Sequence, residues 1–322
     1  MSSINVGIIG GAGYTGGELL RILLNHPQAN IVFINSQSQA GKPVYTTHKD
    51  LFGETELTFT DALPFEEADV IFLCSGHGQS EKFLAENALP ESLKIIDLST
   101  DFRDESNGFV YGLPELNREK ILNSSKIANP GCFATSIELA ILPLAAHHLI
   151  KDDIHVSAIT GSTGAGQALS SSTHFSWRNN NMSIYKAFTH QHLAEIGQSV
   201  KALQADFQHD INFIPYRGNF TRGIMANVYT RFEGTLEEAQ AIYKNYYAAH
   251  PFCHVSDQEI DLKQVVNTNK CIVQLQKNGD KLLITSIIDN LTKGASGQAV
   301  QNMNLIFGIE ETAGLKLKTI GF

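Results

Sequence analysis

The sequence predicts an α/β domain followed by an α+β domain whose sheet is mostly antiparallel. In the first half, short apolar runs at 4–9, 70–74 and 94–98 end in small or polar residues and are separated by helical patterns. This order is typical of a parallel sheet whose strands are buried on both faces. Beyond residue 146 the strand-like runs are longer and alternate between apolar and polar residues, as in a sheet with one buried face.

Composition narrows the class of protein. The 322 residues are 43% hydrophobic and 18% charged, which is ordinary for a globular protein. No run approaches the roughly 18 apolar residues of a membrane span, and the N-terminus lacks the pattern of a leader, so we expect a cytoplasmic protein. The net charge of −9 argues against a nucleic-acid surface. The four cysteines form no CxxC pair, so neither a disulfide framework nor a metal site is expected.

A glycine-rich turn follows the first apolar run. Gly10, Gly13 and Gly16 are spaced three apart in GGAGYTGGEL, between a predicted strand and a predicted helix. Without side chains, such a turn lets a diphosphate approach the amides at the helix N-terminus. The pattern predicts a dinucleotide-binding Rossmann domain, and the alternative is a turn with a purely structural role.

The end of the second predicted strand bears on the choice of dinucleotide. The stretch 35–38 reads Asn-Ser-Gln-Ser, where an acidic residue would bind the ribose of NAD. No carboxylate at Ser36 or Gln37 would repel a 2′-phosphate, which favours NADP. No arginine stands here either, and Lys42 is the nearest cation.

Cys132 is the principal candidate for chemistry. It lies in IANPGCFATSIELAILP, where Pro130 disfavours helix before it and apolar residues recur at helical spacing after it. A thiol at a helix N-terminus is expected to ionise more readily than a free one, because the helix dipole stabilises the thiolate. The alternative is a buried structural cysteine.

Two further stretches of the second domain carry chemical groups. In FTHQHLAEI, His190 and His192 precede a predicted helix, and either one could be an acid/base for Cys132 because imidazole titrates near neutral pH. The turn TGSTGAGQ at 160–167 could bring backbone amides to a ligand or merely reverse the chain. In the first domain, Arg103 follows a strand and is either an anion clamp or a surface residue.

Taken together, these motifs resemble those of the N-acetyl-γ-glutamyl-phosphate reductases, the NADP-dependent third enzymes of arginine biosynthesis. The matching stretches are GGAGYTGGEL, NPGCFAT, GSTGAG, FTHQHLAEI, GNFTRG and DNLTKGASGQAVQ, which span nearly the whole chain in order. The resemblance implies an NADP-binding Rossmann domain over 1–146 and a catalytic and dimerisation domain over 147–290. It also implies a C-terminal helix, within about 291–322, that packs back onto the first domain, and a homodimer or homotetramer.

The resemblance also implies the roles of individual residues. Cys132 would attack the acyl phosphate and release inorganic phosphate, leaving a thioester that NADPH reduces. His190 would be the acid/base, with His192 as second choice. Substrate anions would contact Arg103, Asn129 and Arg222, with Arg217 in reserve. The expected cofactor-binding residues are Gly10, Gly13, Tyr14, Thr15, Gly16, Ser36, Gln37, Cys74, Ser75, Ser162, Gly164 and Asn290.

Some positions depart from the family pattern, and several alternatives stay open. Gln191 stands where arginine is usual, Ala194 where proline is common, and Ser136 where glycine or alanine is usual. The rival enzymes are aspartate-semialdehyde dehydrogenase and an N-succinyl-specific reductase. A Cys/His hydrolase would not need the glycine turn, and an NADP-sensing Rossmann protein would not need Cys132 and the histidines.

Overall fold

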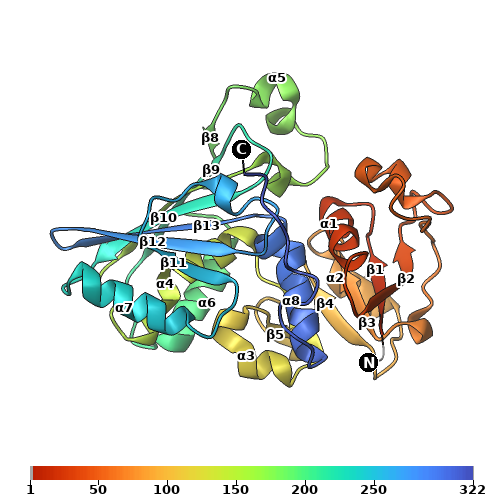
Figure 1. Ribbon diagram of the computed structural model, residues 1–322, viewed down its shortest axis with the longest axis horizontal. Helices are drawn as coiled ribbons and strands as arrows, with labels where there is room; N and C mark the ends of the chain where they lie inside the picture. Colours follow the sequence, from red (N-terminus) through yellow and green to blue (C-terminus); the bar gives the residue numbers. More distant parts are fainter. Residues whose placement is uncertain (1–2, 322) are drawn as a thin grey trace. The chain divides into compact units, whose positions relative to one another are not determined.

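The computed structural model describes residues 3–321, which fold into two compact units (Figure 1). Unit 1 contains residues 3–130 and Ala295–Lys316, and unit 2 contains Gly131–Gly294 and residues 317–321. In the part of the chain that is described, no helix is long and apolar enough to cross a membrane.

Unit 1 is built on a six-stranded sheet in the order β2-β1-β3-β4-β6-β5, and all of its strand pairs are parallel. The parallel sheet predicted from the buried apolar runs is therefore confirmed. Its strands are β1 (Ile4–Ile9), β2 (Ala29–Asn35), β3 (Val70–Leu73), β4 (Lys94–Asp97), β5 (Val110–Tyr111) and β6 (Lys126–Ala128). Its helices are α1 (Tyr14–Leu23), α2 (Gln79–Glu86), α3 (Pro114–Leu122) and α8 (Gly297–Ile306).

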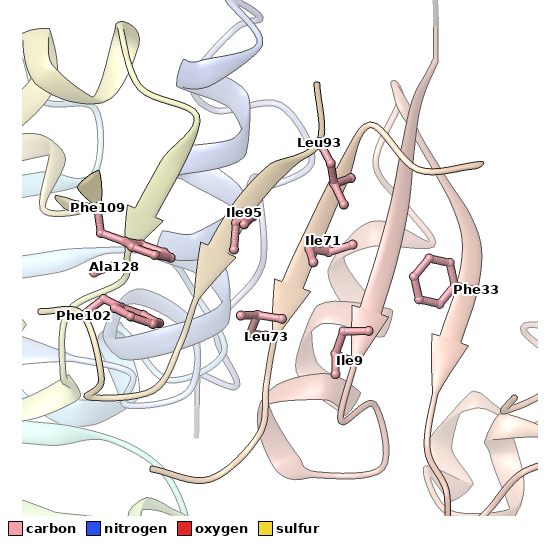
Figure 2. Packing of buried hydrophobic residues seen from close by; sticks show 9 residues of the cluster. All are labelled: Ile9, Phe33, Ile71, Leu73, Leu93, Ile95, Phe102, Phe109 and Ala128. Atoms are coloured by element: carbon pink, nitrogen blue, oxygen red, sulfur yellow. The ribbon is translucent and has the colours of Figure 1, made fainter. Parts of the chain in front are cut away.

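One part of the core of unit 1 lies along these strands, as Figure 2 shows. Ile71 and Ile95 project from neighbouring strands, and the rings of Phe102 and Phe109 stack with centroids 4.2 Å apart. Burial of these aromatic rings and branched side chains against the sheet stabilises unit 1.

Unit 2 is built on a seven-stranded, mixed sheet in the order β11-β12-β13-β10-β7-β9-β8. Only β7 with β9 and β11 with β12 pair in parallel, so the prediction of a mostly antiparallel sheet is confirmed. Its strands are β7 (Ile154–Thr160), β8 (Ser183–Ile184), β9 (Ile211–Arg217), β10 (Ile224–Arg231), β11 (Cys253–Ser256), β12 (Cys271–Asn278) and β13 (Lys281–Ile288).

Three helices of unit 2, α4 (Cys132–Ala146), α6 (His192–Leu203) and α7 (Leu236–Tyr247), cover one face of this sheet (Figure 1). A short helix, α5 (Phe175–Arg178), lies in the connection before β8. Every second residue of β10 is buried, as expected for a strand that presents one face to the helices.

The two units divide before α4, whereas the sequence analysis placed a domain boundary at residue 146. The reason is that α4 is buried on every side from Phe133 to Ala145 and packs against α6, β10 and β13 of unit 2. At the other end of the chain, α8 packs on α1 and α3 within unit 1, and Lys94 donates to the carbonyl of Ile306 at 2.8 Å.

Candidate active site

Cys132 is the first residue of α4. Gly131 is the N-cap and has an extended backbone, and the first turn of the helix contains no acidic residue. Cys132 is partly exposed, although nearly all the rest of α4 is buried. The positive end of the helix dipole therefore lies at an accessible sulfur, an arrangement that in general stabilises a thiolate.

A buried carboxylate holds the backbone that precedes Cys132. Glu195 Oε2 accepts a hydrogen bond from Gly131 N–H at 2.9 Å, and its Oε1 lies 3.9 Å from Nε2 of His192. Glu195 is on α6 and is only 6% exposed. The sequence analysis assigned no role to Glu195, although its position three residues after His192 places both on one face of α6.

His190 and His192 lie together beside the start of α4. Their ring centroids are 4.6 Å apart, and the ring of His190 is 5.6 Å from that of Phe133, the residue after Cys132. Nδ1 of His190 accepts the backbone N–H of His192 at 3.2 Å. Because Nδ1 is an acceptor, the neutral ring carries its proton on Nε2.

The charge state of His190 follows from its surroundings. Burial, and then the positive charge of Lys186, lowers the pKa of His190 to about 4. At neutral pH its imidazole is therefore uncharged and is a hydrogen-bond donor through Nε2.

Gly294 packs directly on Cys132. It lies in a π-helical turn, Thr292–Ser296, that follows β13, and a Cβ added at Gly294 would be 2.8 Å from Cβ of Cys132. Any side chain at this position would push on the cysteine. This contact could not be predicted from the sequence, because nothing in DNLTKG links it to a cysteine about 160 residues earlier in the chain.

Arg222 and Asn290 form side-chain hydrogen bonds within unit 2. Arg222 makes a bidentate ion pair with Asp289 at 2.9 and 3.0 Å and donates to Thr292 Oγ1 at 2.9 Å. Asp289 is fully buried. Asn290 accepts from Gly223 N–H at 2.7 Å and donates to Thr163 at 3.0 Å. Both residues thus connect the turns that follow β7, β9 and β13.

In unit 1, the glycine turn between β1 and α1 forms part of a nucleotide-sized cavity of about 700 Å³. Gly10 has a φ of +76°, and a Cβ added there would be 3.1 Å from the carbonyl carbon of Cys74. At Gly16 a Cβ would be 2.6 Å from Cα of Gly11. Only glycine fits at these two positions, and the open turn fits the diphosphate of a dinucleotide.

The same cavity is lined by the residues that follow β2. Ser36, Gln37 and Ser75, which the sequence led us to expect at the cofactor, line it, and so do two carboxylates that were not expected there, Asp61 and Glu86. Asn35, which also lines the cavity, donates a hydrogen bond to the backbone carbonyl of Asp61 at 3.3 Å.

Two family models match the chain. The first is described as semialdehyde dehydrogenase, NAD binding domain, and covers residues 5–124. The second is described as semialdehyde dehydrogenase, dimerisation domain, and covers residues 132–290. The chain is 62% identical to the N-acetyl-gamma-glutamyl-phosphate reductase of Christiangramia forsetii, over 98% of each chain. It is 59% identical to that of Phocaeicola vulgatus, over 99% of this chain and 100% of the other.

The chain belongs to the N-acetyl-gamma-glutamyl-phosphate reductase family.

Solved structures of aspartate semialdehyde dehydrogenases share the fold of this reductase family member. One from Vibrio cholerae, complexed with ASA, has a TM-score of 0.75 at 17% identity and covers 96% of this chain and 99% of its own. One from Candida albicans, with NADP, has a TM-score of 0.71 at 15% identity, covering 95% and 99%.

The remaining predicted residues of this reductase family member are distributed over both units. In unit 1, Tyr14 and Thr15 begin α1. Thr15 hydrogen-bonds the thiol of Cys74, while burial raises the pKa of Cys74 to about 12. Arg103 is buried and donates to the carbonyl of Asn129 at 3.0 Å.

Asn129 in turn donates to the carbonyl of Ala295 at 3.1 Å, so its side chain is also held within unit 1. In unit 2, Ser162 and Gly164 lie in the turn Ser162–Ala165 after β7, which Ser162 N–H anchors to the carbonyl of Phe220 at 2.8 Å.

Proposed function

We propose that this chain reduces N-acetyl-γ-glutamyl phosphate to N-acetylglutamate 5-semialdehyde with NADPH, through a thioester on Cys132, as a step of arginine biosynthesis. The observation that carries the proposal is the position of Cys132, partly exposed at the start of α4 beside His190, in a chain 62% identical to a reductase of that name. An N-succinyl substrate is the alternative for the same chemistry.

Each step assigns a task to a residue of the chain. The Cys132 thiolate attacks the acyl carbon, the bond to the phosphate oxygen breaks, and inorganic phosphate leaves with one proton from solvent. NADPH, when bound, supplies the hydride that reduces the thioester. The oxyanion of the resulting hemithioacetal then re-forms the carbonyl as the carbon–sulfur bond breaks, which releases the semialdehyde and restores the thiolate.

His190 is proposed to stabilise the oxyanion that forms at the acyl carbon. Its Nε2–H is the donor, because Nδ1 is occupied by the N–H of His192. This arrangement favours His190 as a donor over a role as base for the thiol. Glu195 is proposed to hold Gly131, and with it the start of α4, in place.

The preference for NADPH is proposed from the residues after β2. Ser36, Gln37 and Ser38 line the cavity without a carboxylate, and Lys82 adds a cation to the same wall. Asp61 and Glu86 oppose this preference, and Glu86 pairs with Lys82 at 3.8 Å.

A homodimer is proposed through unit 2, which matches the dimerisation domain model. The face of its sheet opposite the helices presents half-exposed residues, among them Tyr229, which is 41% exposed and stacks on His155. The cytoplasmic location expected from the sequence stays a prediction.

Phosphate-dependent reduction of NADP⁺ by N-acetylglutamate semialdehyde tests the function, with N-succinylglutamate semialdehyde and aspartate semialdehyde as comparison substrates. Iodoacetamide tests the nucleophile. It should label Cys132 first, in step with loss of activity, because Cys253 and Cys271 are buried and the Cys74 thiol has a pKa of about 12. Full activity after complete labelling of Cys132 would exclude the thioester route.

A further inference from the structure

Two arginines of unit 2 lie side by side near the end of β9. Arg178 is buried, and its guanidinium donates to the carbonyls of Ser172, Asn181 and Arg217 and to the hydroxyl of Ser183. All of these acceptors are neutral. Within residues 3–321, neither Arg178 nor Arg217 forms an ion pair with a carboxylate, so two positive charges stand together without a counter-charge.

One buried hydrogen-bond donor of the Arg217 side chain lacks an acceptor among the described residues. It donates to Ser172 Oγ at 3.3 Å, while its Nε is buried and has no hydrogen-bond partner among the described residues. A buried donor left unpaired costs free energy, and in a native structure it indicates either strain or an absent partner. A ligand with negatively charged oxygens would supply both the missing acceptor and the missing counter-charge.

A chain of aromatic rings connects Arg217 to the start of α4. Its guanidinium carbon lies 4.8 Å from the ring centroid of Tyr185, whose ring is 5.7 Å from that of His190. Burial and the negative charge of Cys132 raise the pKa of Tyr185 to about 12, and the positive charge of Arg217 opposes them. Tyr185 is therefore within electrostatic reach of both Cys132 and Arg217.

Arg222, which was expected to bind substrate through its guanidinium, differs from Arg217 in having a carboxylate partner. Its Nε and Nη2 already hold both oxygens of Asp289, whereas Arg217 has no carboxylate partner in the part of the chain that the structure describes. An arginine that lacks a counter-charge and stacks on a tyrosine next to His190 is better suited to hold an anion of the substrate.

We propose that Arg217 binds an anionic group of the acyl-phosphate substrate, either its carboxylate or its phosphate, with Arg178 adding positive charge and Tyr185 orienting the guanidinium. The inference rests on the proposed function and assigns substrate recognition within it. The planar guanidinium can make two parallel hydrogen bonds with either anion, whereas a lysine at the same position would provide only a point charge.

The reverse reaction separates the two anions, because the semialdehyde carries the carboxylate and inorganic phosphate is a separate substrate. Arg217→Met should raise the KM of one of the two by about 10- to 100-fold, the range for a lost hydrogen bond to a charged group, with a smaller change in kcat. A raised KM for the semialdehyde identifies the carboxylate, and a raised KM for phosphate identifies the phosphate. Arg217→Lys should recover part of the loss.

Arg231→Met is the matched control. Arg231 is at the end of β10, its side chain is 54% exposed, and its neighbours Glu233 and Asp280 are carboxylates. Both KM values should be unchanged in this variant. The proposal is overturned if folded Arg217→Met and Arg217→Lys keep both KM values of the unmodified chain.

Calorimetry with N-acetylglutamate and with inorganic phosphate separates this inference from the proposed function. If the unmodified chain turns over no semialdehyde, the proposed function fails. Weaker binding of either anion to Arg217→Met than to the unmodified chain then still supports the anion site. Equal binding of both anions to the two proteins overturns it.

Discussion

Replacing Gly294 by alanine places a methyl group against the cysteine on which the proposed chemistry depends. The new Cβ would be 2.8 Å from Cβ and 3.2 Å from Cα of Cys132. Carbon atoms in good contact are about 3.5–4.0 Å apart, so the structure must yield by roughly 1 Å. Part of that movement must be taken up by Cys132, because the turn at Gly294 is held by its N–H bond to the carbonyl of Asp289 at 2.9 Å.

This geometry predicts both a loss of stability and a loss of rate. Overpacking of this kind costs about 1–3 kcal/mol in the free energy of unfolding. A shift of roughly 1 Å in a reacting group costs about 10²-fold in rate. We therefore expect Gly294→Ala to lower kcat about 100-fold, with little change in NADPH affinity, since the glycine turn of unit 1 is untouched.

Gly197→Ala is the matched control, because no atom lies within 4 Å of a Cβ added at Gly197 in α6. That variant should keep its kcat and gain about 0.5–1 kcal/mol in stability, as alanine does over glycine within a helix. The measurements are kcat for semialdehyde oxidation, the rate of iodoacetamide labelling at Cys132, and urea denaturation. The reasoning is refuted if Gly294→Ala matches the unmodified chain in both kcat and labelling rate.

Three further predictions concern the cofactor, an ion pair and pH. Ser36→Asp should weaken NADPH binding by about tenfold or more without weakening NADH binding, because the new carboxylate would repel the 2′-phosphate. Fluorescence titration with both nucleotides measures this, and an equal loss of affinity for both would contradict the prediction. Arg222→Met should lower the free energy of unfolding by about 3–5 kcal/mol, because it leaves the buried carboxylate of Asp289 unpaired; an unchanged urea midpoint would count against the ion pair. The pKa of His190 is lowered from 6.5 to about 4 in the folded chain. Between these two pH values the unfolded chain binds a proton that the folded chain does not bind. The free energy of unfolding should therefore fall as the pH drops through this window, by up to about 3 kcal/mol. In His190→Asn this part of the pH dependence should disappear from urea titrations, and kcat should fall about 10²–10³-fold, as for the loss of one oxyanion donor.

Local signals in the sequence were sufficient for much of the fold and for the position of Cys132 at the start of a helix. The first apolar run, 4–9, was predicted to be a strand and is β1 with the same ends. Cys132 begins a helix as predicted. Each of these predictions depends on residues within one turn or one strand, where backbone preference and periodicity act directly.

The short strands were missed for the same reason. The strands β5 and β8 have only two residues each, too few to show any periodicity, and they exist because β6 and β9 offer hydrogen-bonding edges to them. The position of α4 in unit 2 was likewise decided by the surface that buries it, not by its own pattern.

The sequence by itself determined which residues could do chemistry, because thiol, imidazole and guanidinium groups can be identified from residue type. Only the tertiary structure decided what each of them contacts. Glu195 accepts a hydrogen bond from Gly131, Gly294 packs on Cys132, and Asp289 forms an ion pair with Arg222. The partners in each of these pairs are more than 60 residues apart in the chain, so their contact depends on how helices and strands pack and leaves no periodic signal in the sequence.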